Sequence, residues 1–116
     1  MIRRRSESGA ATLLVTAMAG VLLLLGAALA VVTAMVAAHR VAQSAADLAA
    51  LAGARGLAAG HDGCDTARRI AAANGARLTG CEVVGRVVDV EVRAPGPHWL
   101  GQSADLSARS RAGPAP

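Results

Sequence analysis

This chain has almost no aromatic residues and no lysine. It has one tryptophan, Trp99, and no tyrosine or phenylalanine, although 53% of its 116 residues are hydrophobic. A core built from alanine, valine and leucine alone is thin, so a water-exposed domain of this size needs an additional constraint. The basic residues are all arginines, and stacking aromatics are missing among them. Despite a net charge of +4, we therefore exclude nucleic acid as a partner and favour the anionic headgroups of a lipid bilayer.

Sequence motifs for catalysis are also missing. The chain has no glycine-rich phosphate loop, no HExxH and no GxSxG. His61, Cys64, Cys81 and His98 could supply two nitrogens and two sulfurs to zinc, but their spacing matches no paired-ligand motif. We therefore expect no enzymatic activity, no cofactor, no bound metal and no small-molecule substrate.

Charge is missing from residues 9–38, and this absence carries the main prediction. At about 1.5 Å per residue the run forms a helix of about 45 Å, longer than the hydrocarbon core of about 30 Å. The sequence therefore predicts a single transmembrane helix. Three arginines precede it, namely Arg3, Arg4 and Arg5, and two follow, Arg40 and Arg55. The compact first cluster predicts a cytoplasmic N-terminus and an extracytoplasmic C-terminal domain in the cell membrane.

A cleaved secretion signal is the alternative interpretation of this run. Signal peptides have an apolar stretch of about 7–15 residues before a small-residue cleavage site. The run here is about twice that length, although Ala17-Met18-Ala19 and Ala28-Leu29-Ala30 resemble such sites. We expect an uncleaved anchor, with cleavage inside the run as the alternative.

An alanine-rich segment, residues 39–60, continues the helix. It contains strong helix formers and no proline, so the helix should extend to about Ala59 and stop at Gly60, with Gly53 and Gly56 as weak points. Small residues recur every fourth position at Gly26, Ala30, Ala34, Ala38, Ala42 and Ala46. Such rows let helix backbones approach closely in membranes, so we expect a packing surface for other helices. The general abundance of alanine is the alternative explanation.

The remaining sequence predicts a small domain at residues 61–111. Asp62 can cap a helix that begins at Gly63 or Cys64 and ends at Asn74-Gly75. Val88, Val90 and Val92 alternate with charged residues, as in a half-buried strand, and Gly85-Arg86 forms the hairpin turn from a strand that contains Cys81. A weaker third strand lies in residues 104–111, after Pro95-Gly96-Pro97 has broken the sheet. We place Trp99 in the core or over its edge; an anchor at the membrane interface is its other possible use.

The two cysteines lie in different predicted elements of this domain. Cys64 lies in the first turn of the helix and Cys81 in the first strand, both on the predicted inner faces. Thiols tend to pair in an oxidising compartment, and closing this loop contributes about 3 kcal/mol. We expect a Cys64–Cys81 disulfide; a metal site or a reactive thiol is the alternative.

The predicted fold class is therefore α+β. Residues 1–8 form a basic cytoplasmic head, 9–38 the transmembrane helix, 39–60 its alanine-rich extension, and 112–116 a frayed tail. Residues 61–111 form a small extracytoplasmic domain of one helix against a two- or three-stranded antiparallel sheet.

Two segments resemble a known family. Residues 8–11 (SGAA) with the apolar run, and residues 41–52 (VAQSAADLAALA), resemble the N-terminal region of TadE/TadG-like proteins of the tight-adherence (Flp) pilus and related secretion machinery. The matching positions are Gly9, Gln43, Ala46 and Asp47. Pilin precursors of this system carry Glu five residues after the processing Gly, where this chain has Leu14.

The resemblance implies a non-enzymatic, minor pilin or pseudopilin-like subunit. Its long hydrophobic helix would assemble with other pilin-like or secretion-system membrane subunits. The alternative is a membrane-tethered extracytoplasmic binding module, in which residues 61–111 capture a ligand or partner.

Overall fold

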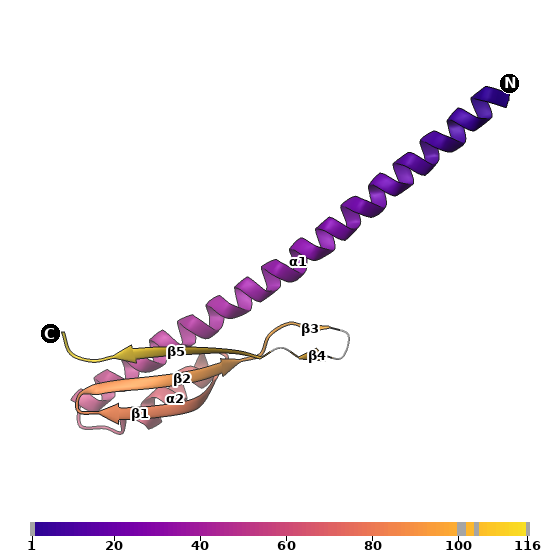
Figure 1. Ribbon diagram of the computed structural model, residues 1–116. Coiled ribbons are helices and arrows are strands. Elements are labelled where there is room, and N and C mark those ends of the chain that lie inside the picture. The colour runs from indigo at the N-terminus through magenta and orange to yellow at the C-terminus, as the bar shows by residue number, and fades with distance from the viewer. Residues whose placement is uncertain (1, 100–101, 104, 116) are drawn as a thin grey trace. The chain divides into compact units, whose positions relative to one another are not determined.

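The computed structural model describes residues 2–99, 102–103 and 105–115, and for residues 2–6, 98–99 and 102–103 it describes the backbone alone. The chain contains helices α1 (Ile2–Ala58) and α2 (Gly63–Ala73) and strands β1 (Arg77–Val84), β2 (Val87–Ala94), β3 (His98–Trp99), β4 (Gln102–Ser103) and β5 (Leu106–Ala112) (Figure 1). This content confirms the predicted α+β class. The described chain divides into two units, of which the first ends at Thr33 and the second begins at Ala34.

The first unit is the apolar part of α1. Nearly all of its large hydrophobic side chains from Leu13 to Val32 are exposed, and Val31 is half-buried. The hydroxyls of Thr12, Thr16 and Thr33 donate hydrogen bonds of 2.8–2.9 Å to the carbonyl four residues earlier. This satisfies the polar side chains inside the helix, as lipid requires. Among the described residues, α1 is the one helix that is long and apolar enough to cross a membrane.

The second unit begins inside α1, which continues to Ala58 without a break. Gly60 then has φ +85°, its N–H donates to the Leu57 carbonyl at 3.1 Å, and the His61 N–H donates to the Gly56 carbonyl at 2.8 Å. This pair of hydrogen bonds is the Schellman motif, which satisfies carbonyls that the helix end leaves unpaired. The predicted stop at Gly60 is therefore confirmed.

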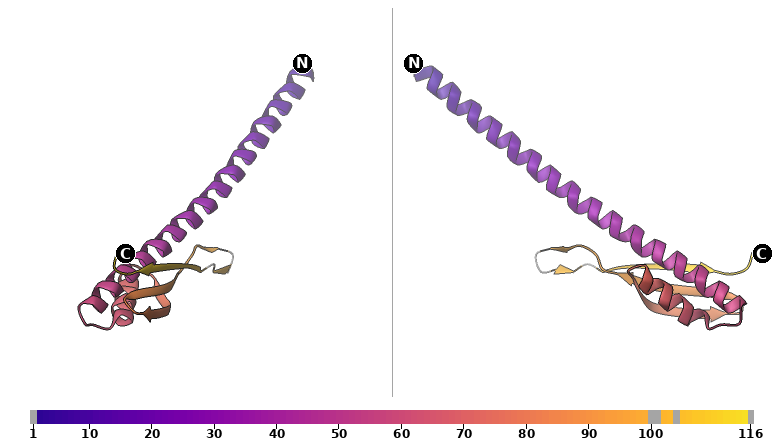
Figure 2. Two further views of the ribbon diagram at one scale, coloured as in Figure 1. Left: turned by 60° about the vertical axis from the view of Figure 1, so that its left-hand side comes forward. Right: turned by 180° about the vertical axis from the view of Figure 1, so that it is seen from behind.

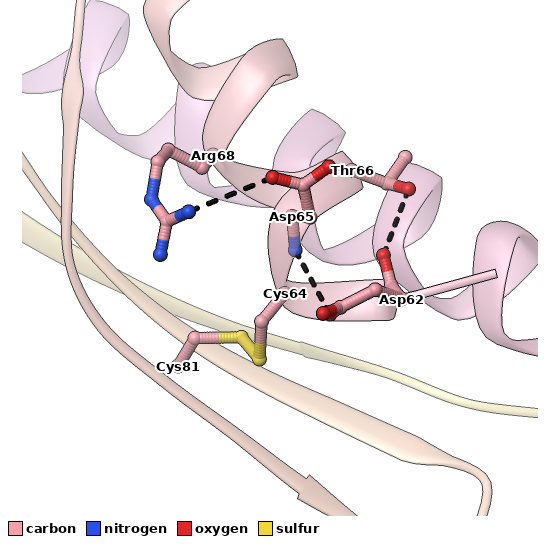
Figure 3. The surroundings of a disulfide bond; sticks show 6 residues. All are labelled: Asp62, Cys64, Asp65, Thr66, Arg68 and Cys81. Atoms are coloured by element: carbon pink, nitrogen blue, oxygen red, sulfur yellow. Dashed lines mark hydrogen bonds and ion pairs between the residues drawn. A yellow bond between two sulfur atoms is a disulfide. The ribbon is translucent and has the colours of Figure 1, made fainter.

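Helix α2 has the predicted cap at each end. The Asp62 carboxylate accepts a hydrogen bond from the Asp65 N–H at 3.1 Å, and the Thr66 hydroxyl donates to the Asp62 carbonyl at 3.0 Å (Figure 3). The helix ends with Gly75 at φ +76° and a bond of 2.9 Å from the Ala76 N–H to the Ala71 carbonyl. The Asp62 carboxylate therefore supplies an acceptor for an N–H group that has no backbone partner in the first turn of the helix.

The sheet is antiparallel, with strand order β1-β2-β5. Val84 pairs with Val87 across the predicted Gly85-Arg86 turn, where Gly85 has φ +62°. Strand β5 confirms the weaker third strand, although Ala104 lies outside the described residues. The short β3–β4 pair was not predicted. Trp99 lies in β3, and its side chain, on which our core prediction depends, is outside the described part of the chain.

A bulge in β1 sets the direction of Cys81. Leu78 pairs with Val92, but Gly80 already pairs with Glu91, so Thr79 is the extra residue. In a regular strand, residues three apart point to opposite faces. The bulge instead places both Leu78 and Cys81 opposite inward-facing valines, Val92 and Val90. Cys81 therefore faces α2.

One face of the sheet is covered by helices. Val88, Val90 and Val92 are the largest fully buried side chains. Helices α1 and α2 both lie along the sheet (Figure 2). Their fully buried side chains in this core are all alanines, Ala42, Ala45, Ala46, Ala49 and Ala50 from α1 and Ala67 and Ala71 from α2. Residues 39–60 and 61–111, which the sequence suggested as separate parts, therefore share one core, and two helices cover the sheet where one was expected.

This core corrects the predicted use of Ala42 and Ala46. Both are fully buried inside the chain, so they offer no surface to other helices. Their small side chains instead let α1 lie close to the sheet. The remaining members of the predicted ridge are different: Gly26, Ala30 and Ala34 are exposed and Ala38 is half-buried.

Gly53 and Gly56, expected to be weak points, are where α1 and α2 meet. A Cβ on Gly53 would lie 2.9 Å from the Gly63 carbonyl oxygen, and a Cβ on Gly63 would lie 3.0 Å from the Gly53 carbonyl oxygen. A Cβ on Gly56 would lie 2.8 Å from the Thr66 hydroxyl. The missing side chains let the two backbones touch, so these glycines permit the helical hairpin.

Candidate assembly surface

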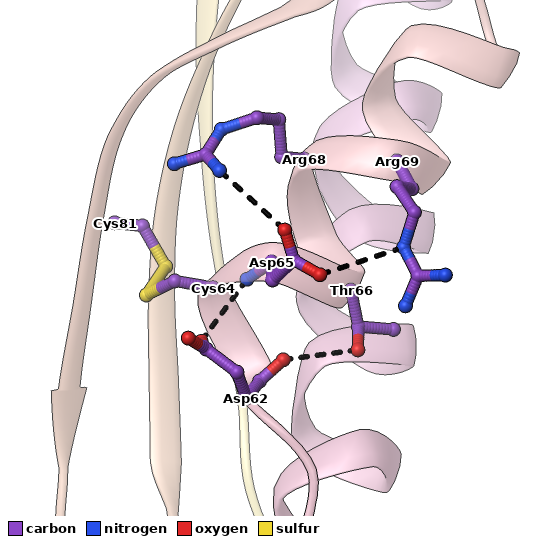
Figure 4. A network of polar contacts seen from close by, with 7 residues as sticks. All are labelled: Asp62, Cys64, Asp65, Thr66, Arg68, Arg69 and Cys81. Carbon is purple, nitrogen blue, oxygen red and sulfur yellow. Dashed lines mark hydrogen bonds and ion pairs between the residues drawn. A yellow bond between two sulfur atoms is a disulfide. The ribbon is translucent and has the colours of Figure 1, made fainter.

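Several polar residues of the domain are joined in ion pairs on its surface. Within the described ranges, no three His, Cys, Asp or Glu side chains gather as metal ligands would. Asp65 lies between Arg68 and Arg69 at 3.6 and 3.7 Å, on the exposed side of α2 (Figure 4). On the outer face of the sheet, the directly paired residues Glu91 and Arg109 are joined at 2.9 Å, and Asp89 and Arg111 at 3.2 Å. Such exposed ion pairs contribute little stability each.

Cys64 and Cys81 form a disulfide. Their Cα atoms are 5.8 Å apart, and the bond joins the first turn of α2 to β1 (Figure 3). Neither cysteine is then free to bind a metal, so the alternative zinc site would lack both of its sulfur ligands. The crosslink closes a loop with a sequence separation of 17, which contributes about 3 kcal/mol in the chain-entropy model. This is a large share of the stability that a core of alanines and valines can provide.

Three of the four residues that carry the family resemblance attach α1 to the sheet. The Gln43 side-chain amide donates to the Asp47 carboxylate at 3.0 Å and to the Arg109 carbonyl, on β5, at 3.2 Å. Ala46 is buried in the core. Asp47 thus orients Gln43, and Gln43 connects two segments 66 residues apart. Sequence reasoning missed this contact, because nothing near Gln43 indicates its partner.

The fourth residue, Gly9, lies inside α1 with open space around it. Gly26 is also unobstructed. Arg3, Arg4 and Arg5 lie in the first turns of the same helix, where only the backbone is described. The membrane topology that these arginines predict is therefore not tested by the structure and stays a prediction.

An exposed strip lies on the side of α1 that faces away from the core. Val41, Leu48 and Leu51 are 49, 43 and 45% exposed, and Ser44 and Arg55 are exposed between and after them. The spacings of seven and three residues place these side chains on one helix face. We call Val41, Ser44, Leu48, Leu51 and Arg55 the exposed strip. Two leucines and one valine that are half-exposed on a helix with a well-buried face make this strip a candidate surface for a partner.

A groove of about 500 Å³ lies beside the end of the exposed strip. Leu51, Ala54, Leu57 and Ala58 form its apolar side, Arg55 and Arg86 its charged side, and Gly113 and Pro114 its remaining border. The sequence did not indicate this groove, because its walls come from α1, the β1–β2 turn and the end of β5.

The N-terminal half of the chain has a recognisable family signature. Residues 9–56 match the family described as "Putative Flp pilus-assembly TadE/G-like". The resemblance noted in the sequence is therefore confirmed over this segment, which includes the apolar helix and Gln43, Ala46 and Asp47. No curated protein and no solved structure matches the chain significantly. The matched segment is thus similar to a pilus-assembly family, and it lies within the helix that is long and apolar enough to cross a membrane.

Proposed function

We propose that this protein is a non-enzymatic minor pilin or pseudopilin-like subunit of a Flp (Tad) pilus or a related secretion apparatus. The observation that carries the proposal is α1 itself. Its first unit exposes large apolar side chains throughout, and the family match covers this helix as far as residue 56. A helix of this kind is stable only among lipids or other apolar helices.

The proposed topology follows from charge. The N-terminal arginines stay in the cytoplasm, residues 9–38 cross the cell membrane once, and the sheet and α2 lie outside it. The disulfide supports this orientation, because stable disulfides form in extracytoplasmic compartments and are rare in the cytosol.

In this proposal α1 has two roles, one for residues 9–38 and one for the part of the helix beyond Ala38. Within residues 9–38, small residues allow other apolar helices to come close, and exposed leucines fill the space around them. Beyond Ala38, the buried alanines and Gln43 hold the domain on the helix. The domain is thereby attached to the assembling helix, without any need for chemistry of its own.

The test is a volume change on the exposed ridge. Gly26→Leu and Ala30→Leu should abolish pilus or secretion-apparatus assembly, scored by surface fibres or by the secreted product, because bulk there keeps neighbouring helices apart. Ala28→Leu, with the same added volume as Ala30→Leu but about 160° away around the helix, is the control. Membrane extraction and the mass of the oxidised chain show that each variant is anchored and folded.

Assembly that survives both ridge substitutions, in variants that are correctly anchored and oxidised, would contradict the proposal. So would normal assembly in cells that lack the protein altogether.

A membrane-tethered binding module is the second candidate. It is favoured by the groove with Arg55 and Arg86 beside an apolar wall. Such a module predicts that Arg86→Ala removes the cellular function while Gly26→Leu leaves it intact. The proposed pilin role predicts the opposite pattern.

A further inference from the structure

We propose that the exposed strip binds a second copy of this chain, in parallel and offset by one heptad. The proposal rests on the function proposed above and identifies the partner and the register of one assembly contact. In the offset pair, Arg55 of one copy lies against Asp47 of the other, and Leu51 lies level with Ser44.

The strip has the spacing that such a contact requires. Val41, Leu48 and Arg55 are seven residues apart, and Ser44 and Leu51 lie between them, also seven apart. Positions that repeat every seven residues line up along one side of a helix that packs against another helix. A shift of seven residues therefore places each position level with an equivalent position on the neighbour.

Shared anchoring determines the direction. Both copies enter the membrane by the same apolar run and continue from it as the same helix, so a parallel pair keeps both anchors on one side of the membrane. An antiparallel pair would require one copy to be anchored from the opposite side.

Charge selects the offset. In a parallel pair without an offset, Arg55 faces Arg55 of the neighbour, which places two like charges together at the end of the contact. After an offset of one heptad, Arg55 lies level with Leu48 of the neighbour. The hole around Leu48 is formed by Ser44, Asp47, Leu48 and Leu51. The Arg55 stem then covers leucine while its guanidinium reaches Asp47.

Both charged groups are available for this contact. Arg55 is exposed and has no ion-pair partner in the described part of the chain. Asp47 is exposed and uses only its Oδ1 atom for Gln43. Asp47 is therefore held in a defined position with one oxygen still free.

The membrane can accommodate the offset. One heptad is about 10.5 Å along a helix. The run at residues 9–38 is about 45 Å long, about 15 Å more than the hydrocarbon core. Two copies shifted by about 10.5 Å can therefore both keep an apolar segment across the whole core. An anchor of minimal length would forbid this shift.

The test is site-directed crosslinking of full-length chains in membranes. One tagged copy carries Ser44→Cys and a second, differently tagged copy carries Leu51→Cys. Mild oxidation should give mostly mixed dimers of the two. Mostly Ser44→Cys homodimers would show a contact without the offset and would overturn the proposal. Crosslinks only to other proteins, or none at all, would also overturn it.

A charge change provides the second measurement. Arg55→Glu should lower the yield of the mixed dimer about fivefold, because a like-charge contact with Asp47 replaces an ion pair. Arg86→Glu changes the other groove arginine and should leave the yield unchanged. An unchanged yield with Arg55→Glu would contradict the predicted register.

The ridge variants separate this inference from the proposed function. If Gly26→Leu abolishes assembly but the mixed dimer never forms, only the homotypic contact is wrong. If the mixed dimer forms but Gly26→Leu has no effect on assembly, the contact stands and the pilin role falls.

Discussion

Gly53→Ala should destabilise the domain, although alanine is the better helix former. In an exposed helix interior, Gly→Ala gains about 1 kcal/mol. Here the added Cβ would lie 2.9 Å from the Gly63 carbonyl oxygen and 3.2 Å from Val88 Cγ1. The first of these is backbone of α2 and cannot rotate away. Overpacking of this kind costs about 1–3 kcal/mol. Since a fixed backbone group is involved, we take the upper end of this cost, and after the gain in helix propensity a net loss of about 2 kcal/mol remains.

Hydrogen exchange of the β2 amides measures this loss directly in the detergent-solubilised chain. Val88, Val90 and Val92 are buried, so their amides exchange only when the domain opens. A loss of about 2 kcal/mol corresponds to about thirtyfold faster exchange. Gly63→Ala should act in the same direction, because its Cβ would lie 3.0 Å from the Gly53 carbonyl oxygen.

Gly20→Ala is the matched control. It adds the same methyl group to α1 where nothing lies within 4 Å, so exchange in β2 should not change. If Gly53→Ala exchanges as slowly as the wild type, the two helices can separate without cost, and the argument for a glycine contact is refuted.

Three further predictions use the same exchange measurement or thermal unfolding. Gln43→Ala should cost about 1 kcal/mol because it removes the bond to the Arg109 carbonyl, and a smaller effect of Asp47→Asn, which keeps an acceptor oxygen, would agree with a merely orienting role. Cys64→Ser together with Cys81→Ser should cost about 3 kcal/mol, and a reductant should reproduce this loss in the wild type but not in the double variant. Asp62→Ala should cost about 1 kcal/mol while Asp62→Ser restores most of it, since serine can also accept the Asp65 N–H; equal losses in both variants would show that the cap is unimportant.

Features with a local signature could be predicted from the sequence. Asp62, Gly60 and Gly75 mark helix ends by their own chemistry, because capping and a positive φ depend on the residue itself and its neighbours. The alternation at Val88, Val90 and Val92 likewise reports burial without knowledge of the partner. The disulfide followed from two residues on predicted inner faces.

Features that depend on distant partners could not be predicted. Gly53 resembles a helix defect until Gly63 is seen against it. Thr79 gives no sign that it is the extra residue of a bulge. Most importantly, a row of alanines has the same appearance whether it faces another subunit or its own sheet, so Ala42 and Ala46 could be assigned only from the fold.

For the candidate site, the family signature was visible but its physical meaning was not. Gln43 and Asp47 were identified by resemblance, whereas their role in holding α1 to β5 required the structure. The exposed strip was not recognised because alanines and leucines occur on several faces of this segment, so the sequence does not show which face is buried.

The shared core has a practical consequence for anyone who wants to study the extracytoplasmic part in isolation. A fragment that starts at His61 would keep the cysteines, α2 and all the strands, yet lose the five alanines that seal one side of the sheet. Val88 and its neighbours would then face water, and such a fragment should be molten or insoluble. A cut before Val41 removes the apolar run but leaves those alanines and Gln43 in place, so it is the boundary from which a folded, water-soluble version should be made.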